Sequence, residues 1–291
     1  MKILVTGANG KLGGELCRQL KSDAIARDVD TLDLTHGATV TREILELHPG
    51  AVINCAAYTQ VDLAESEVGK CRAVNVQAVG HLAAVCRALD CPLVQISTDY
   101  VFGGRQMRGN PYREDERPSP QGVYAQSKYD GESAAGEHAK HLIVRTCGLY
   151  ARPSDEKARN FLKTVLRFGR SQPELKIVAD QHCTPSYVPH VARAVLALLG
   201  VTRPEPAPWG IYHVTNRGET TWYEFAVEAF RLAGMETSLA PISTAEYGAA
   251  APRPAYSVLD TTAYHRLGGP PMPDWKQALK EYFDELTAIE N

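Results

Sequence analysis

The chain has 291 residues, a formal net charge of −3 and an isoelectric point near 6.3, which give no reason to expect a nucleic acid or an anionic membrane as its partner. No stretch is apolar for long enough to span a bilayer, and the N-terminus has no signal-peptide pattern, so we expect a cytoplasmic protein. Its seven cysteines are scattered and form no C-x-x-C pair, so we expect neither a disulfide framework nor a zinc cluster, and we predict no metal site.

Short apolar segments alternate with helical segments through the first half of the chain. The predicted strands are 2–6, 24–27, a short one at 31–34, 51–56, 93–97 and 141–146. Helices between them carry apolar stripes, at Leu12, Leu16 and Leu20, and at Val79, Leu82, Val85 (or Cys86) and Leu89. This alternation is typical of βαβ units, whose fixed handedness predicts an α/β fold with a Rossmann-type doubly wound parallel sheet.

The second half of the chain is less regular. Its residue pattern predicts helices at 159–169, at 189–200, from Thr220 or Thr221 to about Leu232, and at the C-terminus at 274–288. It also predicts strands at 175–178 and 210–214, and a proline-rich loop at 203–208. We expect residues 1–150, with a return segment at about 175–200, to form the Rossmann domain. Residues 151–174 and 201–291 then form a smaller, mixed α/β C-terminal lobe for the substrate.

A glycine-rich loop, Gly7-Ala8-Asn9-Gly10-Lys11-Leu12-Gly13, joins the first strand to the first helix. Glycine at this spacing permits a tight turn and a close approach to a pyrophosphate, which the N–H groups at the start of the helix attract. We therefore predict that residues 1–150 bind NADPH or NADH through Gly7, Asn9, Gly10, Lys11, Leu12 and Gly13.

The end of the second strand, where the adenosine ribose is expected, reads Arg27-Asp28. An acid favours the free hydroxyls of NAD and an arginine favours the 2′-phosphate of NADP, so this pair predicts use of both cofactors or a modest preference. Asp33 and Leu34 follow, and they are placed to contact the adenine, although Asp33 is equally typical of a turn or a helix cap.

Tyr124 and Lys128 lie four residues apart in a predicted helix, so both side chains share one face. An ammonium group beside the phenol lowers its pKa and makes it a proton donor near neutral pH. The same spacing is also typical of a partly solvated helix surface. Strand 93–97 ends in Thr98, Asp99 and Tyr100, at the edge of the sheet where ligands of α/β proteins bind.

The order Thr98, Tyr124, Lys128 behind a glycine-rich loop resembles the extended short-chain dehydrogenase/reductase family, and the resemblance covers nearly the whole chain. Within it the pattern is most similar to the dTDP-4-dehydrorhamnose reductases. The runs that carry this similarity are 54–65, 97–102, 160–164, 178–181, 210–213, 221–226 and 253–260. Several segments that match in order are more specific than any one of them.

The resemblance implies an oxidoreductase that uses NADPH or NADH to reduce the C4 keto group of dTDP-4-dehydro-6-deoxy-L-mannose to dTDP-L-rhamnose. Tyr124 would donate the proton, Lys128 would bind the nicotinamide ribose, and Thr98 would hydrogen-bond the reacting oxygen. Further cofactor contacts are implied at Ala56, Ala57, Tyr58 and Asn75, and sugar contacts at Val61, Thr98, Asp99, Tyr100, Gln181 and Arg253.

Three of these assignments have an alternative in the chain itself. Asn75 is equally well read as a structural amide that bonds neighbouring backbone. Asp99 is also typical of an acceptor that orients its own turn, and Arg253 of an ion pair with a carboxylate of its own lobe. The resemblance also has two gaps, because the relatives carry a tryptophan where this chain has Gly148 and a glycine where it has Cys183. These changes leave the exact sugar and the nucleotide base open.

Two other functions share this pattern. A related nucleotide-sugar reductase or epimerase is compatible with it, whereas a dehydratase is disfavoured because Asp99 is followed by Tyr100 and not by glutamate. A non-catalytic NADP-binding regulatory subunit, like the β subunit of methionine adenosyltransferase, also retains the tyrosine and the lysine. The runs Asn160-Phe161 and Asp180-Gln181 favour the enzyme. The sequence is compatible with a monomer or a homodimer.

Overall fold

The computed structural model describes residues 1–104, 108–155, 160–203 and 205–290. Position 159 of the predicted helix 159–169 and position 204 of the predicted loop 203–208 lie outside these residues.

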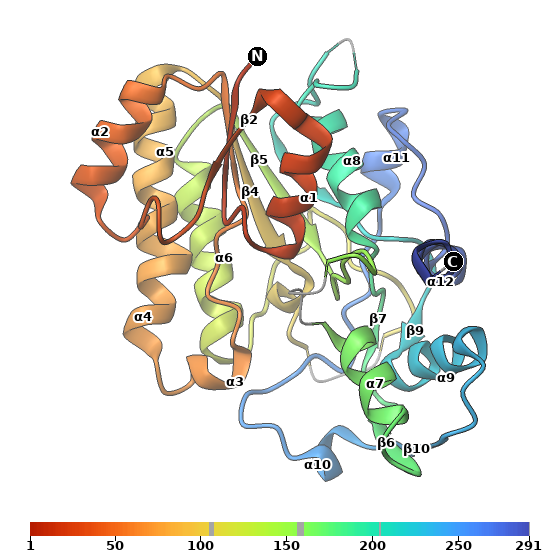
Figure 1. The fold of residues 1–291 in the computed structure, drawn as a ribbon. Helices are drawn as coiled ribbons and strands as arrows, with labels where there is room; N and C mark the ends of the chain where they lie inside the picture. The colour runs from red at the N-terminus through yellow and green to blue at the C-terminus, as the bar shows by residue number, and fades with distance from the viewer. Residues whose placement is uncertain (105–107, 156–159, 204, 291) are drawn as a thin grey trace.

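Six parallel strands form the central sheet, in the order β2-β1-β3-β4-β5-β8 (Figure 1). Their bounds are Ile3–Thr6 for β1, Ala24–Arg27 for β2, Ala51–Asn54 for β3, Leu93–Thr98 for β4, His141–Thr146 for β5 and Gly210–His213 for β8. β1, β3 and β4 are buried at every position, as expected of a parallel sheet covered on both faces. The predicted α/β fold class is confirmed. Because β2 and β3 flank β1 on opposite sides, the ligand-binding edge lies at the carboxyl ends of these strands.

Helices cover both faces of the sheet (Figure 1). Ile3 and Val5 of β1 share a core with α1 (Lys11–Leu20), α8 (Val188–Leu198) and the short α11 (Thr262–Arg266). Leu4 points to the opposite face, as alternation along a strand requires, and shares a core with α2 (Gly37–Leu47) and α5 (Ala78–Leu89). None of the helices in the described part of the chain is long and apolar enough to cross a membrane.

On the second face, α6 (Gly122–Gly136) packs beside α5, and a series of short helices precedes α5 in the chain. These are α3 (Val61–Ala64), α4 (Val68–Arg72) and a π-helical turn at Ala73–Gln77. α6 carries Tyr124 and Lys128 in its first two turns, so the predicted helical spacing of this pair is confirmed.

A smaller group of elements lies below and to the right of the central sheet in Figure 1. It contains two small sheets, in which β6 (Glu174–Val178) pairs with β10 (Ser238–Ile242) and β7 (His182–Cys183) pairs with β9 (Thr220–Thr221). Its helices are α7 (Phe161–Gly169), α9 (Trp222–Ala233), α10 (Thr244–Tyr247) and α12 (Trp275–Glu290). An apolar core rich in aromatic side chains joins α7, α9 and α12.

The predicted strand at 31–34 is wrong. Leu32 and Leu34 are buried, but the backbone around them bonds locally and joins no strand. The N–H groups of Thr31 and Leu32 donate to the carbonyl oxygen of Asp28, and the N–H of Thr35 donates to Oδ1 of Asp33. The segment is a loop that buries two leucines against α2 and α5.

Two strands of the second half of the chain do not lie in the sheets that the predicted division into domains implies. The strand at 174–178, expected in the return segment of the Rossmann domain, pairs with β10 outside the central sheet. The strand at 210–213, expected in the substrate lobe, is instead the sixth strand of the central sheet beside β5. The predicted helix of the return segment does pack on the central sheet, as α8 against α1. The proposed boundaries of the two domains otherwise stay a prediction.

Candidate active site

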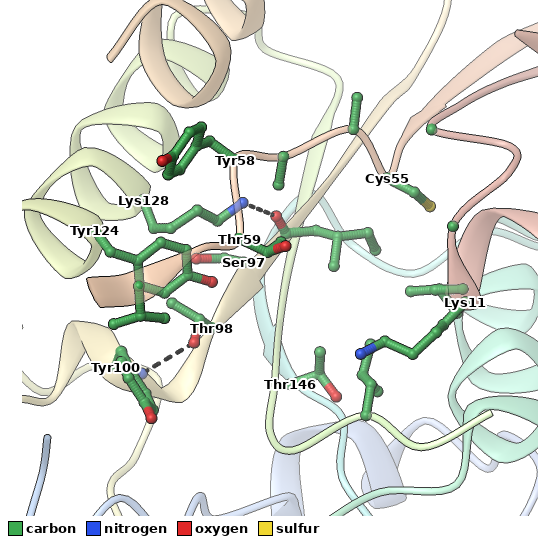
Figure 2. A pocket seen from close by; sticks show the side chains of 18 of the residues that line it. Lys11, Cys55, Tyr58, Thr59, Ser97, Thr98, Tyr100, Tyr124, Lys128 and Thr146 are labelled. Carbon is green, nitrogen blue, oxygen red and sulfur yellow. Dashed lines mark hydrogen bonds between the residues drawn. The ribbon is translucent and has the colours of Figure 1, made fainter. Parts of the chain in front are cut away.

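A cavity of about 770 Å³ lies at the carboxyl ends of β1, β3, β4 and β5. It is lined by every predicted site residue except Arg27, Asn75 and Arg253. Figure 2 shows Tyr124 and Lys128 entering from α6 on one side, with Thr98 below the ring of Tyr124, and Lys11 entering from the opposite side. The structure therefore brings the glycine loop and the predicted catalytic residues into one site.

The glycine loop packs so closely that side chains are excluded at two positions. Gly7 has a φ of +63°, and a Cβ there would lie 2.6 Å from the backbone nitrogen of Ala56. A Cβ on Gly13 would lie 2.2 Å from the carbonyl oxygen of Gly7. Gly10, at the N-cap of α1, brings no side chain to the first-turn N–H groups, and Gly10 to Gly13 line the cavity. This cradle fits the pyrophosphate of a dinucleotide.

Lys11 adds a cation to this cradle. Burial lowers the pKa of its ammonium, and the charge of Asp155 opposes that shift. Figure 2 shows its side chain extending into the cavity toward Thr146. An ammonium at this place complements the negative charge of a pyrophosphate.

Asp28 and not Arg27 faces the cavity at the end of β2. Oδ2 of Asp28 accepts a hydrogen bond from the N–H of Asn9 at 2.8 Å, and Oδ1 accepts one from the N–H of Val29. The guanidinium of Arg27 bonds the carbonyl oxygen of Ala26 at 3.0 Å instead. If the adenosine ribose lies here, as the sequence predicts, the carboxylate of Asp28 would bind its two free hydroxyls and repel a 2′-phosphate, which would favour NADH.

We expect Asp28→Asn to shift the ratio of kcat/KM for NADPH to kcat/KM for NADH by about tenfold toward NADPH, because one charge that repels the 2′-phosphate is removed. The ratio is insensitive to any loss that affects both cofactors equally. Asp30→Asn, an exposed acid two residues further on that does not line the cavity, is the control. An unchanged ratio in Asp28→Asn would place the 2′-phosphate away from this carboxylate.

Asp33 and Leu34 both line the cavity, but Asp33 is also engaged in its own turn. Its Oδ1 accepts hydrogen bonds from the N–H and the hydroxyl of Thr35, at 2.9 and 2.7 Å. These bonds, the backbone one first, lower the pKa of the Asp33 carboxyl. The turn role is thus present in the structure, and the contact with adenine stays a proposal.

The structure supports the structural reading of Asn75. Its Oδ1 accepts from the N–H of Tyr58 at 2.9 Å, and its Nδ2 donates to the carbonyl oxygen of Tyr58 at 3.1 Å and to Oγ of Ser127 at 2.9 Å. The hydroxyl of Ser127 in turn bonds the carbonyl oxygen of Tyr124. Asn75 therefore joins the cavity-lining turn Ala56-Ala57-Tyr58 to the helix that carries Tyr124.

The predicted catalytic residues are held at the end of β4. Nζ of Lys128 donates to the carbonyl oxygen of Ile96 at 2.7 Å, and this ammonium is buried. Burial lowers the pKa of Lys128 to about 8, and the charge of Glu132 opposes the shift. Oγ1 of Thr98 accepts from the N–H of Tyr100 at 3.2 Å (Figure 2).

The pKa of Tyr124 differs from the sequence expectation. Burial raises it above the usual value for a phenol, and a hydrogen bond with Thr98 opposes the shift. The expected lowering of this pKa is therefore wrong for the chain itself, because removal of the phenol from water dominates the shift and the charge of Asp99 adds to it. Tyr124 is fully protonated at neutral pH.

The predicted sugar contacts divide into two groups. Val61, Asp99, Tyr100 and Gln181 line the cavity. Arg253 instead forms a bidentate ion pair with Asp62, with both N–O distances at 2.8 Å. This pairing lowers the pKa of Asp62. The sequence left open an ion pair with a carboxylate of the lobe that contains Arg253, but Asp62 belongs to α3, within residues 1–150.

Asp99 also shows its structural role. Its Oδ2 accepts from Oγ of Ser257 at 2.5 Å, and its Oδ1 accepts from Oγ1 of Thr98 at 3.1 Å. Burial raises the pKa of the carboxyl, and the hydrogen bonds from Ser257, Cys147 and Thr98 oppose this. Asp99 thus ties the end of β4 to residue 257 of the other lobe while lining the cavity.

Several lining residues were not predicted from the sequence. Thr146 is paired with Thr98 in the register of β4 and β5, and its Oγ1 is buried without a hydrogen-bond partner in the described part of the chain. A bound ligand can satisfy this hydroxyl. Trp222, the first residue of α9, also lines the cavity. The signal that finds Thr146 is its position at the end of a central strand.

Glu15 is committed to ion pairs. Burial raises the pKa of its carboxyl, but the hydrogen bonds from Arg18, Arg152 and Gln19 together lower it by more. The pKa of Glu15 is therefore below its usual value. Arg152 also pairs with Glu285 at 2.6 Å. Within the described residues, no group of three or more His, Cys, Asp or Glu side chains is placed to hold a metal ion. The expected absence of a metal stays a prediction.

Comparison with known proteins identifies relatives along the whole chain. Residues 1–288 match the family model described as RmlD substrate binding domain. The spore coat polysaccharide biosynthesis protein SpsK of Bacillus subtilis (strain 168) is 38% identical over 99% of this chain and 98% of its own length. The dTDP-4-dehydrorhamnose reductase of Streptomyces griseus is 40% identical over 97% of this chain and 93% of its own length.

Solved structures give the same result. A dTDP-4-dehydrorhamnose reductase from Clostridium acetobutylicum ATCC 824 superposes with a TM-score of 0.92 at 39% identity, covering 99% of this chain and 100% of the other. The enzyme from Bacillus anthracis str. Ames, solved in complex with NADP, gives 0.91 at 37% identity, with 98% and 100% covered. The chain belongs to the dTDP-4-dehydrorhamnose reductase family of the extended short-chain dehydrogenase/reductases.

Proposed function

We propose that the protein reduces the C4 keto group of dTDP-4-dehydro-6-deoxy-L-mannose to dTDP-L-rhamnose, with NADPH or NADH as the reductant. The observation that carries this proposal is the convergence of Thr98, Tyr124 and Lys128 in one cavity with the glycine loop. Family membership supports the reaction class, and the lining residue Asp28 supports use of NADH besides NADPH.

When the cofactor is bound, its reduced nicotinamide supplies the hydride. Tyr124 donates its phenolic proton to the C4 oxygen, whose basicity rises well above that of a phenolate as the carbonyl becomes an alkoxide. A raised pKa of Tyr124 is therefore compatible with the transfer. Thr98 hydrogen-bonds the same oxygen and stabilises the charge that develops on it. The ammonium of Lys128 binds the nicotinamide ribose and stabilises the phenolate that Tyr124 becomes.

The remaining site residues are proposed to hold the two ligands. Val61, Asp99, Tyr100 and Gln181 contact the sugar nucleotide, and Gln181 is oriented by a hydrogen bond to Oγ1 of Thr244 at 2.9 Å. Arg253 is proposed as a positioning residue, because its ion pair with Asp62 fixes the loop after β3 against the substrate lobe. We further propose that the protein is cytoplasmic and acts as a monomer or a homodimer.

The test is an assay of the purified chain with dTDP-4-dehydro-6-deoxy-L-mannose and either NADPH or NADH. We expect the absorbance of the reduced nicotinamide to fall in proportion to dTDP-L-rhamnose formed. Binding of the cofactor without any consumption of it would contradict the enzyme and favour the regulatory subunit. A rearranged sugar without net oxidation of the cofactor would identify an epimerase.

The same assay should be repeated with a second keto substrate. One relative that is 37% identical over 100% of this chain and 97% of its own length is named a probable dTDP-4,6-dihydroxy-2-methyloxan-3-one 4-ketoreductase. Faster turnover of that ketone would keep the reaction class and change the sugar. The departure at Gly148 makes this comparison informative, because residue 148 lines the cavity.

A further inference from the structure

An indole ring closes the cavity beside the end of β5. Gly148 has a φ of +52°, and a Cβ there would lie 3.0 Å from Cη2 of Trp222 and 3.0 Å from Cα of Pro185. Gly148 and Trp222 both line the cavity. A side chain at position 148 and the tip of this indole would therefore occupy the same space, and the glycine leaves that space to Trp222.

The indole is held by its neighbours in the substrate lobe. Trp222 is the first residue of α9, whose N-cap Thr221 forms a reciprocal capping box with Glu224, with both bonds at 3.1 Å. Thr221 also pairs with His182 across β7 and β9. The ring of Phe161 packs on the indole with centroids 4.8 Å apart. A ring held in this way presents a fixed apolar surface.

This surface lies next to the proposed reacting centre. Thr98 and Thr146 are partners in the register of β4 and β5, and Gly148 is two residues beyond Thr146. The glycine loop that is proposed to hold the pyrophosphate of the cofactor lies at the other strands, between β1 and α1. The tip of the indole therefore borders the part of the cavity that receives the sugar.

We propose that Trp222 determines sugar specificity by packing against the apolar face of a 6-deoxysugar. This inference rests on the proposed function for the identity of the ligand. A 6-deoxysugar presents C–H groups and a methyl group, which an aromatic ring covers without loss of hydrogen bonds. A hydroxyl at C6 pressed against the same ring would lose its bond to water without replacement.

Binding measurements without turnover test this proposal. In calorimetric titrations we expect Trp222→Ala to weaken the affinity for dTDP-L-rhamnose about ten- to hundredfold, and the affinity for dTDP less than twofold. Trp222→Phe restores most of the loss, because a ring remains. Trp209→Ala, which removes a tryptophan that is 37% exposed and does not line the cavity, is the matched control. Unchanged binding of NADH shows that the variants are folded.

Tryptophan fluorescence gives a second measurement. We expect dTDP-L-rhamnose to quench the tryptophan fluorescence of the wild type and of Trp209→Phe. In Trp222→Phe we expect this quenching to be absent. If Trp222→Ala keeps the tighter binding of dTDP-L-rhamnose over dTDP, the role of Trp222 is overturned and the proposed function stands. If the wild type itself binds dTDP-L-rhamnose no more tightly than dTDP, the sugar gains nothing from Trp222 and this inference fails, whereas the proposed function is decided separately by turnover of the keto sugar.

Discussion

Replacement of Tyr124 by phenylalanine is expected to lower kcat about 10²- to 10⁴-fold, because the variant lacks the hydroxyl that delivers the proton. The ring itself remains, so its edge contact with Tyr100, with centroids 5.9 Å apart, is kept. We therefore expect the dissociation constant for NADH to change less than about threefold. Steady-state kinetics and a direct titration of the cofactor measure the two quantities.

The matched control for this variant is Tyr129→Phe. Tyr129 lies on the same helix, is partly buried against Phe102 and Leu259, and does not line the cavity. We expect it to retain nearly full turnover. Turnover of Tyr124→Phe within threefold of the wild type would remove Tyr124 as the proton donor.

The helices and strands that could be predicted are those whose apolar residues follow a regular spacing within one segment. Leu12, Leu16 and Leu20 recur at helical spacing, and they lie in the core between α1 and the sheet. The strands at 3–6, 24–27 and 93–98 were predicted nearly to the residue. A buried parallel strand is a continuous apolar run, so its own residues are enough to find it.

Pairing between distant segments was not predictable in the same way. The run Leu175-Lys176-Ile177-Val178 predicts a strand from its own residues, but its partner Ser238–Ile242 lies 64 residues further along the chain, with Glu174 opposite Ser238. The local residues of β8 likewise do not specify that Val144 and Tyr212 lie side by side. The two strands were therefore found and assigned to the wrong sheets.

The residues of the site were also predictable only where one segment of the chain carries the reason. The glycine loop was predictable, because its glycines lie in one segment and share one physical reason. Trp222 was not, because its place in the cavity depends on the space left by Gly148, a residue on another lobe. The predicted direction of the Tyr124 pKa shift was wrong for a related reason. Helical spacing indicates that Lys128 is near, but it does not indicate how deeply the phenol is buried. The assignment of catalytic roles stays a prediction.

The second large effect concerns the pH dependence. Because burial lowers the pKa of Lys128 to about 8, its ammonium is charged below that pH and loses its proton as the pH rises through it. Tyr124, whose pKa is raised, keeps its proton throughout this range. We therefore expect kcat/KM to fall above about pH 8, as the charge that binds the ribose and stabilises the phenolate is lost.

Replacement of Lys128 by methionine is expected to lower kcat/KM about 10²- to 10³-fold, the range observed when one charge-stabilising donor is removed from a catalytic site. The chain length is kept, and the descending limb near pH 8 should disappear, because the titrating group is gone. Lys140→Met, which changes a lysine paired with Asp90 on the surface, should leave the pH profile as in the wild type. A limb near pH 8 that persists in Lys128→Met would assign the titration to another group and separate Lys128 from proton delivery.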